Sequence, residues 1–161
     1  MLKRLKEALP TYLIAIALPL VTGVVSALIT RENMDIYRQF NMPPLAPPAW
    51  LFPVVWTVLY VLMGISSAII FLMRDKNPDV ASRGLSYYLI SLVFNFAWSI
   101  IFFNLRSLLF AFLWLLLLFY FVLRTILSYS RVSPLAACLQ IPYILWVAFA
   151  GYLNLAIYLL N

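Results

Sequence analysis

The chain has 161 residues, of which 66% are hydrophobic and 10% are charged, and its formal net charge is +6. A soluble domain usually carries about 25% charged residues, so this composition excludes an ordinary soluble domain and favours a lipid bilayer as the solvent. The length fits one domain over residues 1–161, and the single cysteine, Cys138, excludes an internal disulfide.

The first apolar segment covers residues 9–30 and is long enough to span a bilayer. It is longer than the apolar region of a signal peptide and lacks a clear small-residue cleavage site, so we interpret it as a transmembrane helix. Pro19 lies inside this helix and is expected to kink it. The pair Gly23-x-x-x-Ala27 would allow close contact with another helix.

The connection over residues 31–47 is long for a link between adjacent spans. Structureless loops of this length are often lids or binding loops, so we expect a lid here. Arg31 and Arg38 would either meet the carboxylates of an amphipathic ligand or be solvated and touch lipid phosphates. Tyr37 lies between these two arginines.

The second span covers residues 48–73 and begins in a stretch rich in proline and tryptophan. Pro48 is expected in the first helical turn, where proline is accepted, and Pro53 is expected to kink the helix. A second small-residue pair, Gly64-x-x-x-Ala68, would again allow close helix contact. Spacings of three and four place four residues on one face of this helix, namely Pro53, Trp56, Tyr60 and Gly64.

The remaining spans cover residues 84–104, 107–130 and 134–159. Pro134 suits the first turn of the last span, and Pro142 is expected to kink it. The third and fifth spans each carry a face like that of the second, with aromatic residues beside small or polar ones. These faces are Asn95, Trp98, Ser99 and Phe102 on the third span, and Tyr143, Trp146, Ala150 and Asn154 on the fifth.

Together these segments predict an all-α integral membrane protein, a multi-pass bundle of five transmembrane helices. The alternating pattern of a barrel strand is absent, and unpaired backbone groups are costly in lipid. Lys and Arg residues predominate in the amino-terminal segment and in the loops on its side of the membrane. The positive-inside rule then places the amino terminus in the cytoplasm and the first loop outside. A bacterial cell membrane is the default location, with an organellar or outer membrane as alternatives.

The sequence lacks most of the residues on which familiar membrane chemistry depends. It contains no histidine, and its five acidic residues fall in predicted loops or termini. Proton relays and ion-coupled carriers usually need ionisable groups inside the bundle. There is also no carboxylate pair, metal-ligand cluster or Gly-rich phosphate loop. Hydrolase, kinase, metalloenzyme and ion-pump functions are therefore disfavoured, and no soluble basic face suggests nucleic-acid binding.

The three aromatic faces have two interpretations. Each face taken singly is typical of helix packing, with Asn95 and Asn154 as interhelical hydrogen-bonding groups. Three such faces among five helices favour a shared aromatic pocket. Such a pocket suits a flat, largely apolar ligand, because ring stacking contributes about 0.5–1.5 kcal/mol per pair.

Three blocks of sequence carry a family resemblance: PPLAPPAWLFPVVWTVLY at residues 43–60, NFAWSIIFF at 95–103, and PYILWVAFAGYLN at 142–154. In order and spacing they resemble the translocator protein family, TspO/MBR, whose members are also called tryptophan-rich sensory proteins and peripheral benzodiazepine receptors. The resemblance covers essentially the whole chain.

This resemblance implies a five-helix bundle, often a homodimer, that binds porphyrin, haem and other hydrophobic small molecules without a required cofactor or metal. Trp56 and Trp146 match the pocket tryptophans that take part in light-dependent oxidative breakdown of protoporphyrin. Asn95 matches the pocket asparagine, and Tyr37 resembles the first-loop tyrosine that covers the site. Pro47 and Ala150 match pocket-lining positions, and the aromatic faces add further ligand-binding candidates, namely Tyr60, Trp98 and Tyr143.

The resemblance leaves three functions open. The chain would be a receptor that degrades bound tetrapyrroles in light, a transporter of tetrapyrroles or related amphipathic molecules, or a ligand-responsive sensory protein. Whether it is an enzyme stays open. Animal members bind cholesterol through a carboxyl-terminal motif that ends in a basic residue. No basic residue follows Tyr152 or Tyr158 here, so the sequence does not support sterol binding through that motif.

Overall fold

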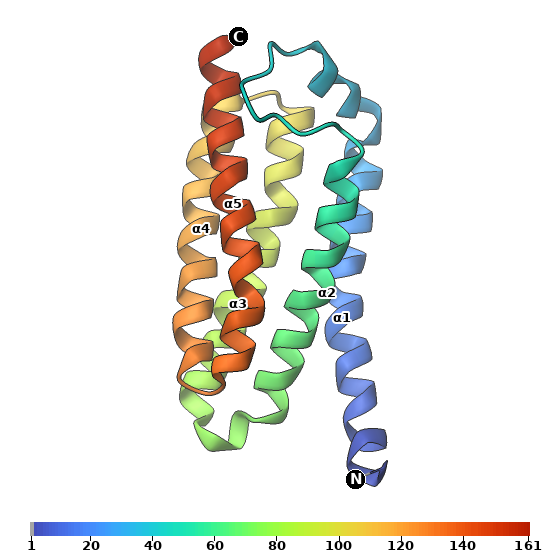
Figure 1. Cartoon of the computed structure of the whole chain (residues 1–161), viewed down its shortest axis with the longest axis vertical. Helices are drawn as coiled ribbons and strands as arrows, with labels where there is room; N and C mark the ends of the chain where they lie inside the picture. Colours follow the sequence, from blue (N-terminus) through green and yellow to red (C-terminus); the bar gives the residue numbers. More distant parts are fainter. Residues whose placement is uncertain (1) are drawn as a thin grey trace.

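The computed structural model describes residues 2–161, with side chains from residue 8 onward. The described residues form five long helices that run up and down along one axis (Figure 1). All five are long and apolar enough to cross a membrane, so the predicted all-α transmembrane bundle is confirmed. The helices are α1 Leu2–Thr30, α2 Leu51–Leu72, α3 Pro78–Ser99, α4 Leu108–Ser130 and α5 Pro134–Leu160.

Helix α3 begins six residues before the predicted start of the third span. The Asn77 side chain accepts a hydrogen bond from the Val80 N–H, and Pro78 follows at the first helical position. An N-cap and a proline at this position favour helix initiation. The first two turns are polar, so a prediction from apolar character alone missed them. Pro134 begins α5 as predicted, after Ser133 as N-cap.

Two predictions about prolines at the start of the second span were wrong. Helix α2 begins at Leu51, and Pro48 lies before it, where its carbonyl accepts the Leu51 N–H at 3.0 Å. Pro53 is therefore in the first turn of α2, where N–H groups have no helical acceptor. It interrupts no helical hydrogen bond and gives no cause for a kink. Pro19 and Pro142 do lie inside their helices, as predicted.

The first loop is partly helical, contrary to the expectation of a structureless segment. Residues Arg31–Gln39 form a 3₁₀ helix, η1, which follows α1 directly. The rest of the loop crosses the end of the bundle towards α2 (Figure 1). Its backbone is fastened to α5, because the Tyr152 hydroxyl donates to the Pro44 carbonyl at 2.8 Å and Asn161 Oδ1 accepts the Asn41 N–H at 2.9 Å.

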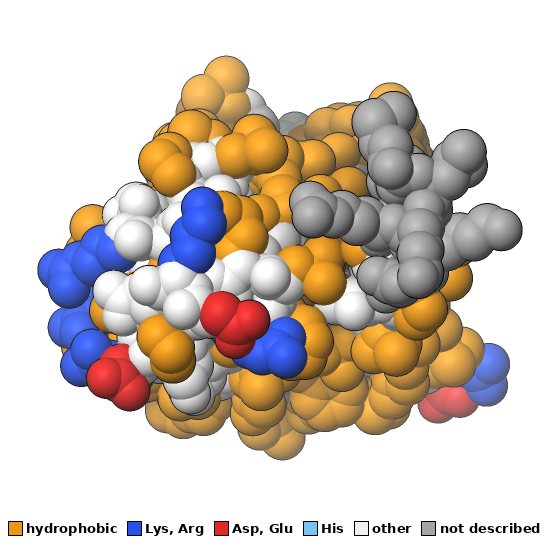
Figure 2. Space-filling model, turned by 90° about the horizontal axis from the view of Figure 1, so that it is seen from below, with side chains coloured by type: hydrophobic (Ala, Val, Ile, Leu, Met, Phe, Trp, Pro, Cys, Tyr) orange, Lys and Arg blue, Asp and Glu red, His pale blue; other side chains and the backbone are white. Residues whose placement is uncertain are grey.

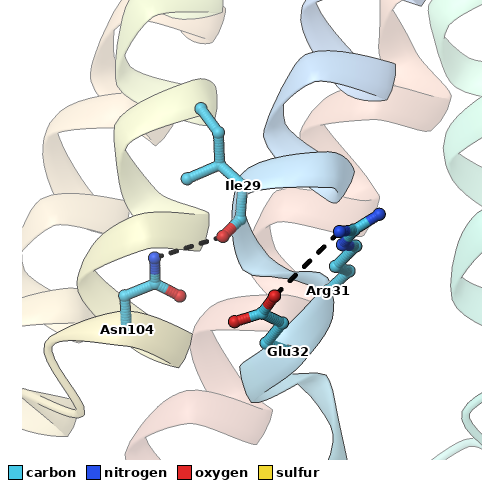
Figure 3. A network of polar contacts seen from close by, with 4 residues as sticks. All are labelled: Ile29, Arg31, Glu32 and Asn104. Atoms are coloured by element: carbon cyan, nitrogen blue, oxygen red, sulfur yellow. Dashed lines mark hydrogen bonds and ion pairs between the residues drawn. The ribbon is translucent and has the colours of Figure 1, made fainter.

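Helix α3 ends in a widened turn, the π-helix η3 over Ile100–Asn104. Its closing hydrogen bond runs from the Leu105 N–H to the Ile100 carbonyl at 3.0 Å. Asn104 then bridges to the carboxyl end of α1 and to η1. Its side-chain amide donates to the Ile29 carbonyl at 3.4 Å (Figure 3), and its Oδ1 accepts from Asn33 at 3.0 Å.

Helices α1 and α2 approach each other closely at Gly64. A Cβ at this position would lie 2.5 Å from the Ile16 Cα and 2.7 Å from the Ala15 carbonyl oxygen, so only glycine fits without moving α1. The small-residue pair Gly64-x-x-x-Ala68 therefore serves a contact within the chain. This contact fixes the position of α1 beside the aromatic face of α2.

Candidate ligand-binding cavity

A cavity of about 290 Å³ lies between α1, α2, α3 and α5, at the end of the bundle covered by η1. Its wall is built from the carboxyl-terminal parts of α1, α3 and α5 and the amino-terminal part of α2. No charged side chain is among the described residues that line it. Six of the predicted ligand-binding residues line it: Tyr37, Trp56, Tyr60, Asn95, Trp98 and Ala150.

Trp56 is the centre of an aromatic cluster in this wall. Its ring stacks on Tyr60 with centroids 5.4 Å apart and an interplanar angle of 27°. Tyr143 and Trp146 meet it edge-on, at centroid distances of 6.2 and 6.5 Å. Offset-stacked and edge-on pairs are the favourable geometries for aromatic rings. The indole of Trp56 is therefore held on several sides and presents its remaining surface to the cavity.

Two asparagines fix the polar groups of the wall. Asn95 Oδ1 accepts from the Tyr60 hydroxyl, and its Nδ2 donates to the Tyr143 hydroxyl, both at 3.1 Å. Asn154 Oδ1 accepts from Trp98 Nε1 at 3.2 Å, and its Nδ2 donates to the Leu108 carbonyl at 2.8 Å. Both asparagines thus act as interhelical hydrogen-bonding groups and also lie at the cavity. At these two positions, helix packing and lining of the cavity are therefore not alternatives, because the same side chain does both.

The first loop closes the cavity through Tyr37. The Tyr37 hydroxyl donates to the Pro47 carbonyl at 3.1 Å, and its ring meets Phe52 edge-on at 5.2 Å. Pro47 does not line the cavity itself, and its carbonyl instead holds the tyrosine that does. The role of the loop as a lid stays a prediction.

The two arginines of the loop take no part in the cavity. Arg31 and Arg38 are exposed, and neither is a lining residue. Arg31 forms a loose ion pair with Glu32 at 4.0 Å, with both side chains largely in solvent (Figure 3). An exposed pair of this kind contributes little to stability. The structure thus favours the solvated alternative for these arginines over recognition of a ligand carboxylate.

Two predicted residues of α5 lie behind the wall. Tyr143 is buried, does not line the cavity, and contacts two residues that do, Asn95 and Trp56. Trp146 meets Trp56 edge-on and lines a separate apolar groove between α2 and α5, with Val58 and Phe149 among the lining residues. Trp146 Nε1 is buried and has no hydrogen-bond partner among the described residues. Helical spacing predicted the shared face, but it could not predict which neighbour each residue meets.

Sequence reasoning missed the contribution of α1. Gly23 and Ala27 line the cavity, and a Cβ at Gly23 would overlap the Tyr60 ring at Cε2. The small-residue pair in the first span was the available signal, because small side chains leave room for rings from other helices. Phe52 and Phe103 also line the cavity and were not predicted.

Comparisons with known proteins place these observations in a family context. The family model described as TspO/MBR family matches residues 15–160. The chain is 36% identical over 152 residues to the tryptophan-rich protein TspO of Chlorobaculum tepidum, covering 94% of this chain and 96% of that protein. It is 37% identical over 138 residues to the translocator protein of Bos taurus, covering 85% and 82%. It is 30% identical over 151 residues to the tryptophan-rich sensory protein of Cereibacter sphaeroides, covering 94% and 89%.

Proposed function

This chain belongs to the TspO/MBR family of multi-pass integral membrane proteins, and from that premise we propose that it is a receptor for tetrapyrroles such as protoporphyrin and haem. The ligand would bind in the cavity between α1, α2, α3 and α5. We further propose that the protein promotes the light-dependent oxidative degradation of the bound macrocycle.

The observation that carries this proposal is the aromatic wall around Trp56. A flat macrocycle gains little by leaving lipid for another apolar place, so selectivity depends on shape and ring stacking. The Trp56–Tyr60 stack and the Trp98 ring offer such surfaces within one cavity. The described wall of the cavity has no charged group, which suits the neutral, largely apolar core of a porphyrin.

The size of the cavity means that a large ligand could enter only if the first loop moves. Pockets for small molecules span about 300–1,000 Å³, and this cavity of about 290 Å³ is at the lower end. A tetrapyrrole is large among such ligands, so its entry requires the first loop to move. Tyr37 is the lining residue that the Pro47 carbonyl holds in place, so its side chain would have to leave this hydrogen bond for the cavity to open.

The proposed photochemistry needs no acid or base. A porphyrin absorbs visible light, and an adjacent indole is an easily oxidised side chain. Trp56 lies in the cavity wall and is the indole best placed to give an electron to the excited macrocycle. Dioxygen would then add to the reduced macrocycle, and one electron would return to the oxidised indole as the ring opens. The net oxidant is dioxygen, whose two atoms end in the opened product. Trp146 meets Trp56 edge-on and would donate through it.

One observation favours transport as a second candidate function. The apolar groove lined by Trp146 lies between α2 and α5, and Trp146 contacts Trp56 of the cavity wall. Movement of these two tryptophans would join the groove to the cavity and give an amphipathic molecule a path from the bilayer. A liposome flux assay in which the protein leaves porphyrin movement unchanged would eliminate this candidate.

We also propose that the amino terminus faces the cytoplasm of a bacterial cell. Figure 2 views the end of the molecule that carries the α2–α3 and α4–α5 connections, and Lys and Arg side chains gather on one part of it. An excess of these residues marks the cytoplasmic side of a membrane protein. Tagging each terminus with a reporter that is active on only one side of the membrane would test this orientation.

The test of the function is a titration of the detergent-purified protein with protoporphyrin in the dark, followed by illumination. Binding is measured by quenching of tryptophan fluorescence, and degradation by loss of the porphyrin absorbance. The variants are Trp56→Phe and Trp146→Phe, with Trp50→Phe as the matched control, because Trp50 is 66% exposed and does not line the cavity.

We expect saturable quenching and light-dependent porphyrin loss, both reduced in Trp56→Phe and unchanged in Trp50→Phe. Because Trp146 acts through Trp56, its variant should slow degradation more than it weakens binding. If a variant that combines Trp56→Phe with Trp146→Phe degrades porphyrin as fast as the unmodified protein, the photochemical role proposed for these tryptophans is wrong. If no quenching saturates, the cavity is not a porphyrin site.

A further inference from the structure

A second candidate site lies on the outer surface between α3 and α4, away from the cavity. Arg124 belongs to the membrane-spanning helix α4, yet its side chain is exposed. Its guanidinium donates to the hydroxyl of Tyr87 on α3 at 3.2 Å and to the hydroxyl of Tyr120 on α4 at 3.4 Å. The guanidinium carbon lies 5.1 and 5.9 Å from the centroids of these two rings.

These contacts hold the cation in place without neutralising it. A guanidinium near an aromatic face is attracted to the ring, but neither tyrosine supplies a negative charge. Among the side chains of residues 8–161, the one ion pair is Arg31–Glu32, at the lid end of the bundle. A charged side chain within a membrane span is costly unless it is paired or reaches the interface. The described residues thus leave the charge of Arg124 unpaired near the end of α4, where an anion from outside these residues can reach it.

Several hydrogen-bond donors are left over at this site. A guanidinium carries five N–H donors, and the two bonds to tyrosine use two of them. Both tyrosine hydroxyls accept from Arg124, so their own O–H groups are free to donate. A phosphate oxyanion suits this set, because it accepts several hydrogen bonds and pairs with arginine through two parallel contacts.

The position of the site matches the headgroup layer of a bilayer. Arg124 lies about 9 Å along the helix axis from Ser130, where α4 ends. That end of the molecule is rich in cations (Figure 2). In the other direction, an exposed apolar strip at helical spacing leads from Arg124 towards the bilayer centre, and it consists of Tyr120, Leu117, Leu116 and Leu113. A molecule bound here would contact a cationic group at one end and the apolar strip along its length.

We propose that Arg124, Tyr87 and Tyr120 form a binding site for the phosphate of an anionic phospholipid, whose acyl chain lies along α4. The chemistry recognised is the phosphate oxyanion, and the apolar strip favours a lipid over free phosphate. This site is separate from the cavity, and it does not depend on the nature of the ligand bound there.

Native mass spectrometry of the detergent-purified protein tests this proposal. The probes are phosphatidylglycerol and phosphatidylcholine with the same acyl chains, and inorganic phosphate at matched concentration. The variants are Arg124→Gln, Arg124→Lys and Tyr87→Phe. The matched control is Arg131→Gln, which removes the same charge at the same end of α4 but from a side chain without an aromatic cation contact.

We expect the unmodified protein to bind one phosphatidylglycerol more tightly than phosphatidylcholine. Arg124→Gln should weaken phosphatidylglycerol binding roughly tenfold, because it removes the positive charge and most of the donors that meet the phosphate. Arg124→Lys keeps the charge but loses the planar fork, so most of the preference should be lost. Arg131→Gln should have little effect.

Three results would overturn the proposal. Equal weakening by Arg124→Gln and Arg131→Gln would mean that only the total charge of this end matters. Displacement of the lipid by inorganic phosphate at matched concentration would make free phosphate the occupant. Equal binding of the two lipids would remove the anionic preference. The thermal midpoint of each variant checks its folding, and Tyr87→Phe, which keeps the ring and loses one hydroxyl, remains informative if an arginine variant fails to fold.

Discussion

The substitution Gly23→Ala, which adds one methyl group, tests whether the position of the Tyr60 ring shapes the cavity. In Gly23→Ala the new Cβ would lie 3.0 Å from Tyr60 Cδ2 and Cζ and overlap Cε2, so the ring has to move. Movement of the ring breaks its hydrogen bond to Asn95 and its stack on Trp56. These contacts are worth about 1 kcal/mol and about 0.5–1.5 kcal/mol.

The change also has a compensating term, because alanine favours a helix over glycine by up to about 1 kcal/mol. The net loss of stability is then about 1 kcal/mol, which corresponds to a fall of roughly 2–4 °C in the thermal midpoint for a chain of this size. Ligand affinity should fall more, roughly tenfold, because both the stacking surface and the cavity shape change. Intrinsic-fluorescence melting and porphyrin titration in detergent measure the two effects.

Gly151→Ala is the control for this experiment. It makes the same substitution within a helix, but a Cβ at Gly151 meets no described atom within 4 Å apart from its chain neighbours and the backbone of its own helix. It should leave affinity unchanged and should not lower the thermal midpoint. If Gly23→Ala and Gly151→Ala behave alike in both assays, the position of Tyr60 does not shape the site, and the proposed architecture of the wall is wrong.

Three further predictions concern the wall, the α1–α2 contact and the lid. Asn95→Leu leaves two buried tyrosine hydroxyls without their partner, so the thermal midpoint should fall by an amount equivalent to about 1–3 kcal/mol; an unchanged midpoint would refute this. Gly64→Ala meets backbone atoms of α1 and should destabilise the protein more than Gly23→Ala in the same melting assay. Tyr37→Phe loses the hydrogen bond to Pro47 within the lid and should speed ligand release roughly fivefold in stopped-flow fluorescence; release no faster than in Tyr158→Phe would show that this bond does not keep the lid closed.

The spans were predictable because lipid requires long apolar helices, and each such helix leaves a continuous run in the sequence. The parts that escaped prediction depend on local polar contacts. The amino end of α3 is polar and begins at an asparagine cap, and the 3₁₀ helix η1 follows α1 within a polar segment. Neither feature leaves an apolar signal.

The cavity was predictable in part for a related reason. Large aromatic residues at helical spacing identified the faces of α2, α3 and α5. Helix α1 contributes mainly through small residues, and Gly23 matters because of the side chain it lacks. The position of Trp146 behind Trp56 depends on how the helices are rotated against each other, and the spacing within one helix does not contain that information.

The π turn at η3 is a place where a change in chain length would alter the shape of the cavity. A π turn is what a one-residue insertion leaves in an α-helix, and here it lies beyond Asn95 and Trp98 and includes Phe102 and Phe103. Deleting one residue of this turn would leave the preceding helix in register and rotate the residues beyond the deletion by about 100°. Asn104 would then lose its contacts with α1 and η1. A change of one residue in chain length would thus change the part of the cavity wall formed by Phe102 and Phe103. The hydrogen-bonded part of the wall around Asn95 would stay as it is.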